Sequence, residues 1–235
     1  MIIKIPFVLR HQEAKVKKQE NPLQMRSIIR ENKLYFIYLT CFIILGGISV
    51  LVWQKPSDIL FFSEKRTAWG DFFFRYVTHL GEAPVFFIAA IIAFFNQPRH
   101  TLSIAATGIL VLGTSFSLKA LFAVDRPLAY FRKVDLIQQI NFVEGVNLHS
   151  GPTSFPSGHA MAAFALYTLL ALLLPKRIGY ATSMFLIALT VGLSRVYLVQ
   201  HFWQDVYAGG LIGVVLALIV FAIYQRFGSR QPSFS

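Results

Sequence analysis

The chain has 235 residues, of which 55% are hydrophobic and only 14% are charged, whereas a typical soluble domain has roughly 25% charged residues. This composition excludes intrinsic disorder, which requires low hydrophobicity, and the single cysteine excludes an intrachain disulfide framework or a cysteine metal cluster. The net charge of +11 indicates an anionic partner, which could be nucleic acid, anionic lipid or an anionic substrate.

Six stretches without Asp, Glu, Lys or Arg follow one another along the chain. About 20 helical residues cross a hydrocarbon core of about 30 Å. The second stretch is the weakest; we expect its helix to begin earlier, near Trp69 or Phe72, and to carry His79 and Glu82 near one membrane interface. Because six such stretches leave no polar exterior for a soluble fold, we predict an all-α polytopic membrane protein with six transmembrane helices. The stretches are 34–54, 83–97, 101–118, 160–175, 178–194 and 206–225.

The chain outside the apolar core is predicted to form two tails. Residues 1–33 are predicted to form a basic tail, residues 34–226 the six-helix membrane domain and residues 227–235 a short C-terminal tail. The tail lacks the small-residue cleavage site of a signal peptide. Met25 is an alternative start that the sequence leaves open.

The distribution of charge predicts the orientation in the membrane. An even number of spans places both termini on one side, and if that side is inside, it carries about +10 and the outer side about +1. An excess of Lys and Arg marks the cytoplasmic side, so we expect cytoplasmic termini in an integral protein of a bacterial inner membrane. The basic excess then fits anionic headgroups, and nucleic-acid binding becomes a poor interpretation.

The first polar cluster lies where the third stretch ends. Lys119 and Arg126 are seven residues apart, or two helical turns, so both side chains are expected to point the same way. Pro127 disfavours continuation of the helix through Arg126. Taken alone, such a pair is typical of two cations that extend to the membrane interface.

The second cluster, Phe155-Pro156-Ser157-Gly158-His159, opens the fourth stretch. Ser157 is expected to be a helix N-cap, and Gly158 would let a ligand approach the backbone closely. The free N–H groups and positive dipole end of such a helix form an anion site, although a plain helix start has the same pattern. His159 would then point its imidazole at a bound anion.

The third cluster connects the fifth and sixth stretches and contains Ser194, Arg195, His201 and Asp205. His201 and Asp205 are four residues apart and are expected to be neighbours on one helix face. A carboxylate that binds one imidazole nitrogen fixes the tautomer and makes the other nitrogen more nucleophilic or basic. The alternative is a structural His–Asp pair that closes a loop. Arg195, at the preceding helix end, adds another cation.

All three clusters are expected to meet on the outer face, because the loops after the third and fifth stretches lie on the same side. The combined site would hold three cations, a helix N-terminus, two histidines and a carboxylate, which favours an anionic ligand. Phosphoryl transfer requires charge neutralisation together with a nucleophile and an acid. A metal phosphatase would require clustered carboxylates, and the motifs contain only Asp125 and Asp205, so we predict no metal and no other cofactor.

Together the clusters resemble the signature of the type-2 phosphatidic acid phosphatase family, also called lipid phosphate phosphatases. That signature is Lys-x6-Arg-Pro, then Pro-Ser-Gly-His, then Ser-Arg-x5-His-x3-Asp. Vanadium-dependent haloperoxidases have a similar anion site, but they are soluble helical proteins, which the six apolar stretches argue against. The matching positions are Lys119, Arg126, Pro127, Pro156, Ser157, Gly158, His159, Ser194, Arg195, His201 and Asp205.

The resemblance implies a role for each of these residues. His201 would be the nucleophile that forms a phosphohistidine, Asp205 would orient it, and His159 would be the general acid. The phosphate oxygens would be held by Lys119, Arg126, Ser157, Gly158 and Arg195. The implied activity is metal-independent hydrolysis of a lipid phosphate or diphosphate at the extracytoplasmic ends of the third to sixth spans.

Substrate identity and reaction type stay open in the sequence. Candidate substrates are phosphatidic acid, phosphatidylglycerol phosphate, undecaprenyl diphosphate and a lipid A phosphate. One alternative is a lipid phosphotransferase that uses the same site, and another is a non-enzymatic transporter or lipid-binding protein, which has no need of an acid and a nucleophile. The long connection 128–155 is expected to shape the headgroup site, or else to be an interfacial loop. It contains Tyr130, Phe131, Arg132, Lys133 and His149.

Overall fold

The computed structural model describes residues 28–174 and 178–228, and these residues fold as helices joined by loops. The predictions for Met25, for most of the basic tail and for residues 229–235 lie outside the described residues. The 3₁₀ turns are η1 (Thr78–Gly81) and η2 (Ile137–Gln139). The α-helices are α2 (Lys33–Val52), α3 (Ser57–Glu64), α4 (Ala68–Val77), α5 (Ala83–Asn96), α6 (Pro98–Phe122), α7 (Pro127–Lys133), α8 (Gly158–Leu173), α9 (Ile178–Tyr197) and α10 (Trp203–Gly228).

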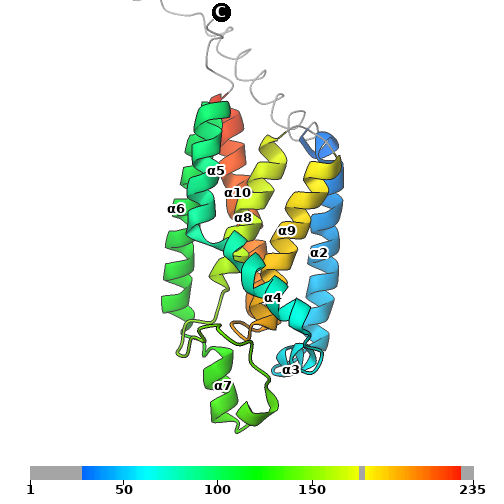
Figure 1. Cartoon of the computed structure of the whole chain (residues 1–235). Coiled ribbons are helices and arrows are strands. Elements are labelled where there is room, and N and C mark those ends of the chain that lie inside the picture. Colours follow the sequence, from blue (N-terminus) through cyan, green and yellow to red (C-terminus); the bar gives the residue numbers. More distant parts are fainter. Residues whose placement is uncertain (1–27, 175–177, 229–235) are drawn as a thin grey trace, which may run out of the picture.

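The long helices stand side by side in one bundle, and the short helices α3 and α7 lie at one of its ends (Figure 1). Four segments are long and apolar enough to cross a membrane: Lys33–Val52, Pro98–Lys133, Gly179–Tyr197 and Trp203–Arg226. A fifth is formed by the pair Ala68–Gly81 and Ala83–Asn96, which is bent by 58°. The all-helical class and the membrane location are therefore confirmed at the level of four to five candidate spans.

The bend between α4 and α5 has a local cause. Pro84 occupies the first turn of α5, where its missing N–H costs nothing, but its ring blocks an uninterrupted helix from the preceding turn. The chain passes through η1 instead, and α4 runs obliquely across the bundle (Figure 1). The helix α4 begins at Ala68, next to the Trp69 expected as the start of the second span.

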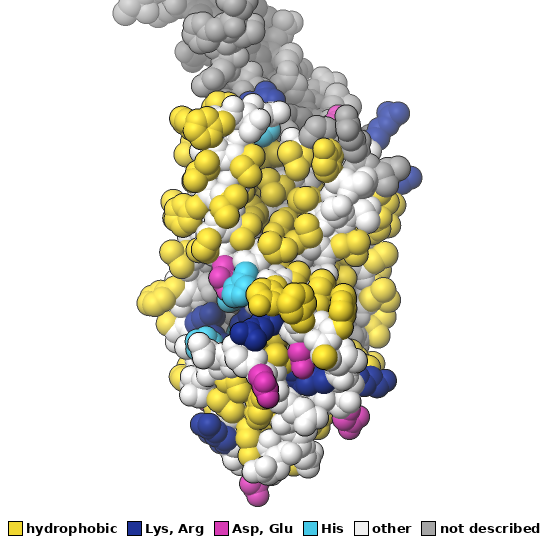
Figure 2. Space-filling view, in the orientation of Figure 1, with side chains coloured by type: hydrophobic (Ala, Val, Ile, Leu, Met, Phe, Trp, Pro, Cys, Tyr) yellow, Lys and Arg dark blue, Asp and Glu magenta, His cyan; other side chains and the backbone are white. Residues whose placement is uncertain are grey.

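The surface of the bundle is apolar, as expected for helices that face lipid. Side chains such as Leu51, Phe95 and Leu102 are exposed, and hydrophobic side chains cover much of the upper face in Figure 2. Charged side chains gather on the same face toward the end that carries α3 and α7 (Figure 2). One end of the molecule is therefore polar, and the bundle above it is hydrophobic.

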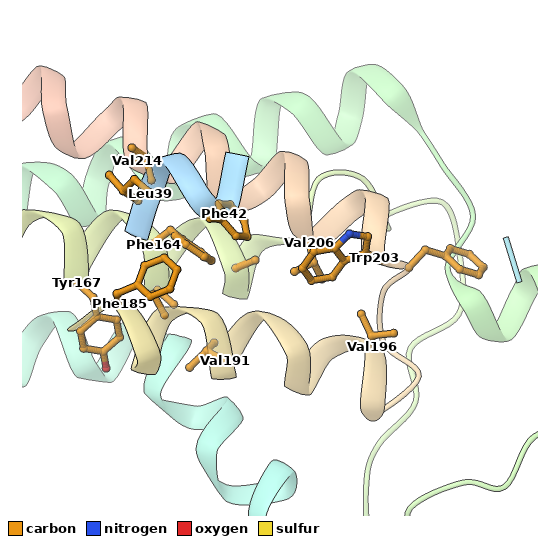
Figure 3. Close-up of a cluster of buried hydrophobic side chains, with 14 of the residues drawn as sticks. Leu39, Phe42, Phe164, Tyr167, Phe185, Val191, Val196, Trp203, Val206 and Val214 are labelled. Atoms are coloured by element: carbon orange, nitrogen blue, oxygen red, sulfur yellow. The ribbon is translucent and has the colours of Figure 1, made fainter. Parts of the chain in front are cut away.

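The centre of the bundle is α8, whose residues are mostly buried. Phe164 of α8 stacks on Phe42 of α2 with ring centroids 4.5 Å apart, and both belong to a cluster that also contains Val191 and Val206 (Figure 3). The helix α10 approaches α8 closely through glycine: a Cβ added at Gly209 would lie 2.5 Å from the carbonyl oxygen of Ser157. The N-terminus of α8 is thus fixed against α10.

Candidate active site

The N-terminus of α8 is built as the sequence predicted. Ser157 is the N-cap; its Oγ accepts a hydrogen bond from Ala160 N at 3.4 Å, and its side chain is buried. Gly158 is the first helical residue. A Cβ there would lie 3.3 Å from Lys119 Nζ, so the absence of a side chain lets the ammonium group approach the free N–H groups of the helix end. An anion at this point would meet both the helix dipole and a cation.

The His201–Asp205 pair exists, but the expected helical geometry is wrong. His201 lies in the loop before α10, and Asp205 is the third residue of that helix. Asp205 Oδ2 accepts a hydrogen bond from Phe202 N at 3.1 Å, which is the reach-back contact of a capping box. The same oxygen lies 3.6 Å from His201 Nδ1. The pair therefore meets because a carboxylate at the helix start turns back toward its own loop.

Ser154 is a site residue that the sequence reasoning missed. Its buried Oγ donates to Asp205 Oδ2 at 2.5 Å and lies 3.5 Å from His201 Nδ1. A buried carboxylate needs donors to offset its desolvation, and Ser154 supplies one from a distant part of the chain. The only available signal was the position of Ser154 just before the Phe155-Pro156-Ser157 motif.

Arg126 is at the site, but it does not share a helix face with Lys119. The helix α6 ends at Phe122, Ala123 takes a left-handed conformation with φ of 46°, and Arg126 is extended. As expected, the helix does not continue through Arg126, and the structure shows that Pro127 begins a new helix, α7. The two cations meet through this turn of the chain. Arg126 and Lys119 are close enough to interact electrostatically with each other.

Two neutral groups hold the Arg126 guanidinium, which is buried. Its Nε donates to Thr153 Oγ1 at 3.0 Å, and its Nη1 donates to Gln200 Oε1 at 3.4 Å. Gln200 in turn donates from Nε2 to the backbone oxygen of Asn147 at 2.9 Å. Loop 198–202 and the long connection are thereby joined around one cation.

Arg195 lies at the end of α9, as expected, and is buried. Its Nη1 donates to Thr78 Oγ1 of η1 at 2.6 Å, and its Nε has no hydrogen-bond partner. Ser194 is fully buried, and its hydroxyl donates to the backbone oxygen of Val191 at 2.6 Å, so it closes the last turn of α9. Arg195 therefore enters the site as a cation held by a neutral hydroxyl.

His159 has an acidic neighbour that the sequence had placed only near the interface. Its Nε2 lies 3.5 Å from Glu82 Oε1, and the same oxygen lies 2.8 Å from His79 Nδ1. Both histidines of the site therefore have a carboxylate partner.

The electrostatic environment of His201 favours its neutral form. Burial, with a smaller contribution from the cations Arg195 and Arg126, lowers the pKa of His201 to about 4, although Asp205 acts in the opposite direction. A neutral imidazole carries a lone pair on the nitrogen that does not face the carboxylate. At neutral pH His201 can therefore act as a nucleophile without first losing a proton.

The long connection contributes structure more than ligands. Phe131 is fully buried, and Tyr130 packs edge-on against Phe202 with ring centroids 5.4 Å apart. Lys133 pairs with Asp125, and Arg132 is exposed. His149 lies close enough to the cations that partial desolvation and then Arg126, Arg195 and Lys119 lower its pKa.

The arrangement can bind a tetrahedral anion and transfer its central group. It combines a helix N-terminus, three cations and two histidines that each have a carboxylate partner. Across the described residues, no group of three or more His, Cys, Asp or Glu side chains has the spacing of a metal site. The fold is that of an all-helical membrane protein, and these side chains form its candidate anion site.

Comparisons with known proteins define the family. The model of the PAP2 superfamily matches residues 99–229, more than half of the chain, and the chain belongs to this superfamily. It is 29% identical to phosphatidylglycerophosphatase B of Bacillus subtilis over 66% of this chain and 75% of that protein. It is 32% identical to lipid phosphate phosphatase 1 of Arabidopsis thaliana over 55% of this chain but only 45% of the plant protein.

Two solved structures have a fold similar to that of this chain. The crystal structure of Aquifex aeolicus LpxE aligns with a TM-score of 0.59 at 26% identity, over 70% of this chain and 92% of that one. A PAP2-type phosphatidylglycerolphosphate phosphatase from Bacillus subtilis aligns with a TM-score of 0.54 at 25% identity, over 86% of this chain and 98% of the other. The resemblance first seen in three short motifs therefore extends over most of the fold.

Proposed function

We propose that this protein is a metal-independent phosphatase that removes phosphate from a lipid phosphate or lipid diphosphate through a phosphohistidine intermediate. The observation that carries the proposal is the buried His201, whose Nδ1 faces Asp205 while Arg126 and Arg195 act on it electrostatically. A purely anion-binding protein would need the cations but would have no use for a neutral imidazole held by a carboxylate.

The proposed reaction has two steps. His201 Nε2 attacks phosphorus, the bond to the lipid oxygen breaks, and His159 gives a proton to that oxygen. Water then attacks the phosphohistidine, His159 takes a proton from the water, and the P–N bond breaks. Lys119, Arg126 and Arg195, with Ser157 and the backbone N–H groups at Gly158, hold the phosphate oxygens and offset the charge that develops on them.

We assign six spans to the bundle: α2, the bent α4–α5 pair, α6, α8, α9 and α10. The helix α8 has only 16 residues, which is short for a span. Most of its residues are buried by neighbouring helices, so it has little contact with lipid. The basic tails favour cytoplasmic termini, which would place the site at the extracytoplasmic membrane surface. A lipid could then keep its chains in the bilayer while its phosphate reaches the cations.

The names of the relatives restrict the substrate to a class. They include phosphatidylglycerophosphatase B, lipid A 1-phosphatase and a putative undecaprenyl-diphosphatase. We therefore expect a phosphomonoester or diphosphate on a lipid. Phosphatidic acid, phosphatidylglycerol phosphate, undecaprenyl diphosphate and a lipid A phosphate are the compounds to test.

The test is phosphate release from this panel by the purified protein in detergent, with and without EDTA. We expect turnover that EDTA leaves unchanged, and radiolabelled phosphate should remain bound to the denatured protein after a brief reaction. The His201→Ala variant should lose both signals, while His100→Gln, about 28 Å away along α6 from Lys119, should keep them. Activity abolished by EDTA, or undiminished in His201→Ala, would refute the mechanism. Adding a competing alcohol acceptor separates hydrolysis from transfer.

A further inference from the structure

The break between α4 and α5 places the carboxylate of Glu82 at the site. The turn η1 is packed without clearance against α8: a Cβ at Gly81 would lie 2.9 Å from the backbone oxygen of His159. Tyr167 of α8 donates its hydroxyl to the backbone oxygen of Leu80 at 3.0 Å. Because both sides of η1 are fixed in this way, the next residue along the chain, Glu82, is held beside the start of α8.

Glu82 does not perform the usual task of its position. It is the N-cap of α5, but its side chain makes no hydrogen bond to that helix. Its Oε1 lies 2.8 Å from His79 Nδ1 and 3.5 Å from His159 Nε2. His79 and Glu82 are three residues apart and form a local pair, so the carboxylate is anchored from one side while it faces His159 on the other.

Apart from Glu82, the charged and titratable neighbours of His159 are basic. The charged and titratable groups that act on it are Lys119 of α6, Arg195 of α9, and Arg126 and His201 in loops. All of them are positive or become positive on protonation. Glu82 is the acidic side chain paired with this imidazole in the described part of the chain. A general acid at this position needs such a partner to hold its proton among three cations.

We propose that Glu82 is a positioning residue for His159: its carboxylate accepts the Nε2–H, which leaves the Nδ1–H directed at the leaving-group oxygen. This inference rests on the proposed function. In the first step the Nδ1 proton moves to the lipid oxygen as the P–O bond breaks and the P–N bond to His201 forms. In the second step water gives its oxygen to phosphorus and one of its own protons to Nδ1, and the P–N bond to His201 breaks. The Nε2–H stays on His159 and is donated to Glu82 throughout.

Leaving-group chemistry tests the proposal. A lipid alcohol leaves poorly unless it is protonated, whereas p-nitrophenolate leaves without a proton. In Glu82→Gln we expect the first-turnover rate to fall about 10- to 100-fold with phosphatidic acid, consistent with partial loss of a general acid. The burst of p-nitrophenolate from p-nitrophenyl phosphate should change less than about threefold, because that step does not need the acid. The alkaline limb of the phosphatidic acid profile should move to lower pH.

Glu144→Gln is the matched control, because Glu144 is exposed and only its backbone oxygen accepts a hydrogen bond, from Arg75. Inhibition by orthovanadate shows that the anion site of each variant is intact. Equal losses on the two substrates, or loss of vanadate inhibition in Glu82→Gln, would assign Glu82 to the packing of η1 and overturn the proposal. A Glu82→Gln variant indistinguishable from Glu144→Gln would also overturn it. Wild-type protein inactive on every lipid phosphate would instead refute the proposed function.

Discussion

Ser154 and Asp205 are 51 positions apart in the chain, yet the hydroxyl of one lies 2.5 Å from the carboxylate of the other. This hydrogen bond fixes the oxygen that also faces His201. The orientation of His201, the proposed nucleophile, therefore depends on the residue just before the helix-start motif, as well as on the His–Asp pair itself.

Replacing Ser154 should impair turnover more than substrate binding. Ser154→Ala removes one donor from a buried carboxylate, a change of about 1.5–3 kcal/mol for a hydrogen bond to a charged group, so kcat should fall at least about tenfold. KM should change little, because the cations proposed to bind the phosphate are untouched. Steady-state kinetics on the preferred lipid measure both constants. Ser150→Ala, at an exposed position of the same connection, is the control; an equal effect there would contradict the assignment.

Thr78 should matter to the site although it lies on η1, outside all three sequence motifs. Thr78→Val keeps the shape but removes the oxygen that accepts from Arg195 Nη1 at 2.6 Å. A buried guanidinium then lacks a partner, which costs about 1–3 kcal/mol or more. We expect a lower melting temperature in detergent and at least about a tenfold loss of kcat/KM. Added phosphate should restore part of the thermal stability, because it supplies the missing acceptor.

The apparent pKa on the acid side of the pH profile should lie well below the ordinary pKa of histidine. The pKa of His201 is lowered to about 4, so its neutral form persists as the pH falls from 7 to 5, and protonation removes the nucleophile only near pH 4. An ordinary histidine with a pKa of about 6.5 would lose about 30-fold in rate by pH 5. The measurement is kcat/KM against pH, corrected for the separately titrated ionisation of the substrate. An apparent enzyme pKa near 6.5 on the acid side of this profile would refute the prediction.

Close packing at the site can be tested with two glycines. In Gly209→Ala the new Cβ would lie 2.5 Å from the backbone oxygen of Ser157, so α10 and the N-terminus of α8 must separate. We expect at least about a tenfold loss of activity and reduced stability, typical of overpacking by 1–3 kcal/mol. Gly113→Ala in α6 meets nothing within 4 Å and should be neutral or slightly stabilising. Thermal unfolding and activity should be measured for both variants. Equal effects of Gly209→Ala and Gly113→Ala would contradict the prediction.

The sequence was most informative where a property depends on near neighbours. The apolar stretches, the Ser157 N-cap and the end of the helix before Pro127 are local effects of hydrophobicity, side-chain capping and proline sterics. The pairing of His201 with Asp205 was also predicted, but its geometry was wrong, because a helical face was assumed where the chain forms a loop.

Contacts between distant segments could not be predicted in this way. Ala123 takes a left-handed turn with no glycine to indicate it, and this turn, not a shared helix face, brings Arg126 to Lys119. The contact of Glu82 with His159 depends on a bend between two helices, and Ser154 reaches Asp205 only after the loop folds over α10. Such contacts follow from the three-dimensional path of the backbone, which spacing alone does not give.

The neutral partners of the buried arginines have a consequence for the catalytic cycle. Arg195 forms no ion pair within the described part of the chain, and burial of such a charge is costly until an anion binds. Inorganic phosphate, the product, supplies such an anion, and a ligand at 100 times its Kd stabilises the folded state by about 2.7 kcal/mol. The protein should thus be most heat-resistant when phosphate occupies the site, so the same charge that binds the substrate also makes the empty site the least stable state of the protein.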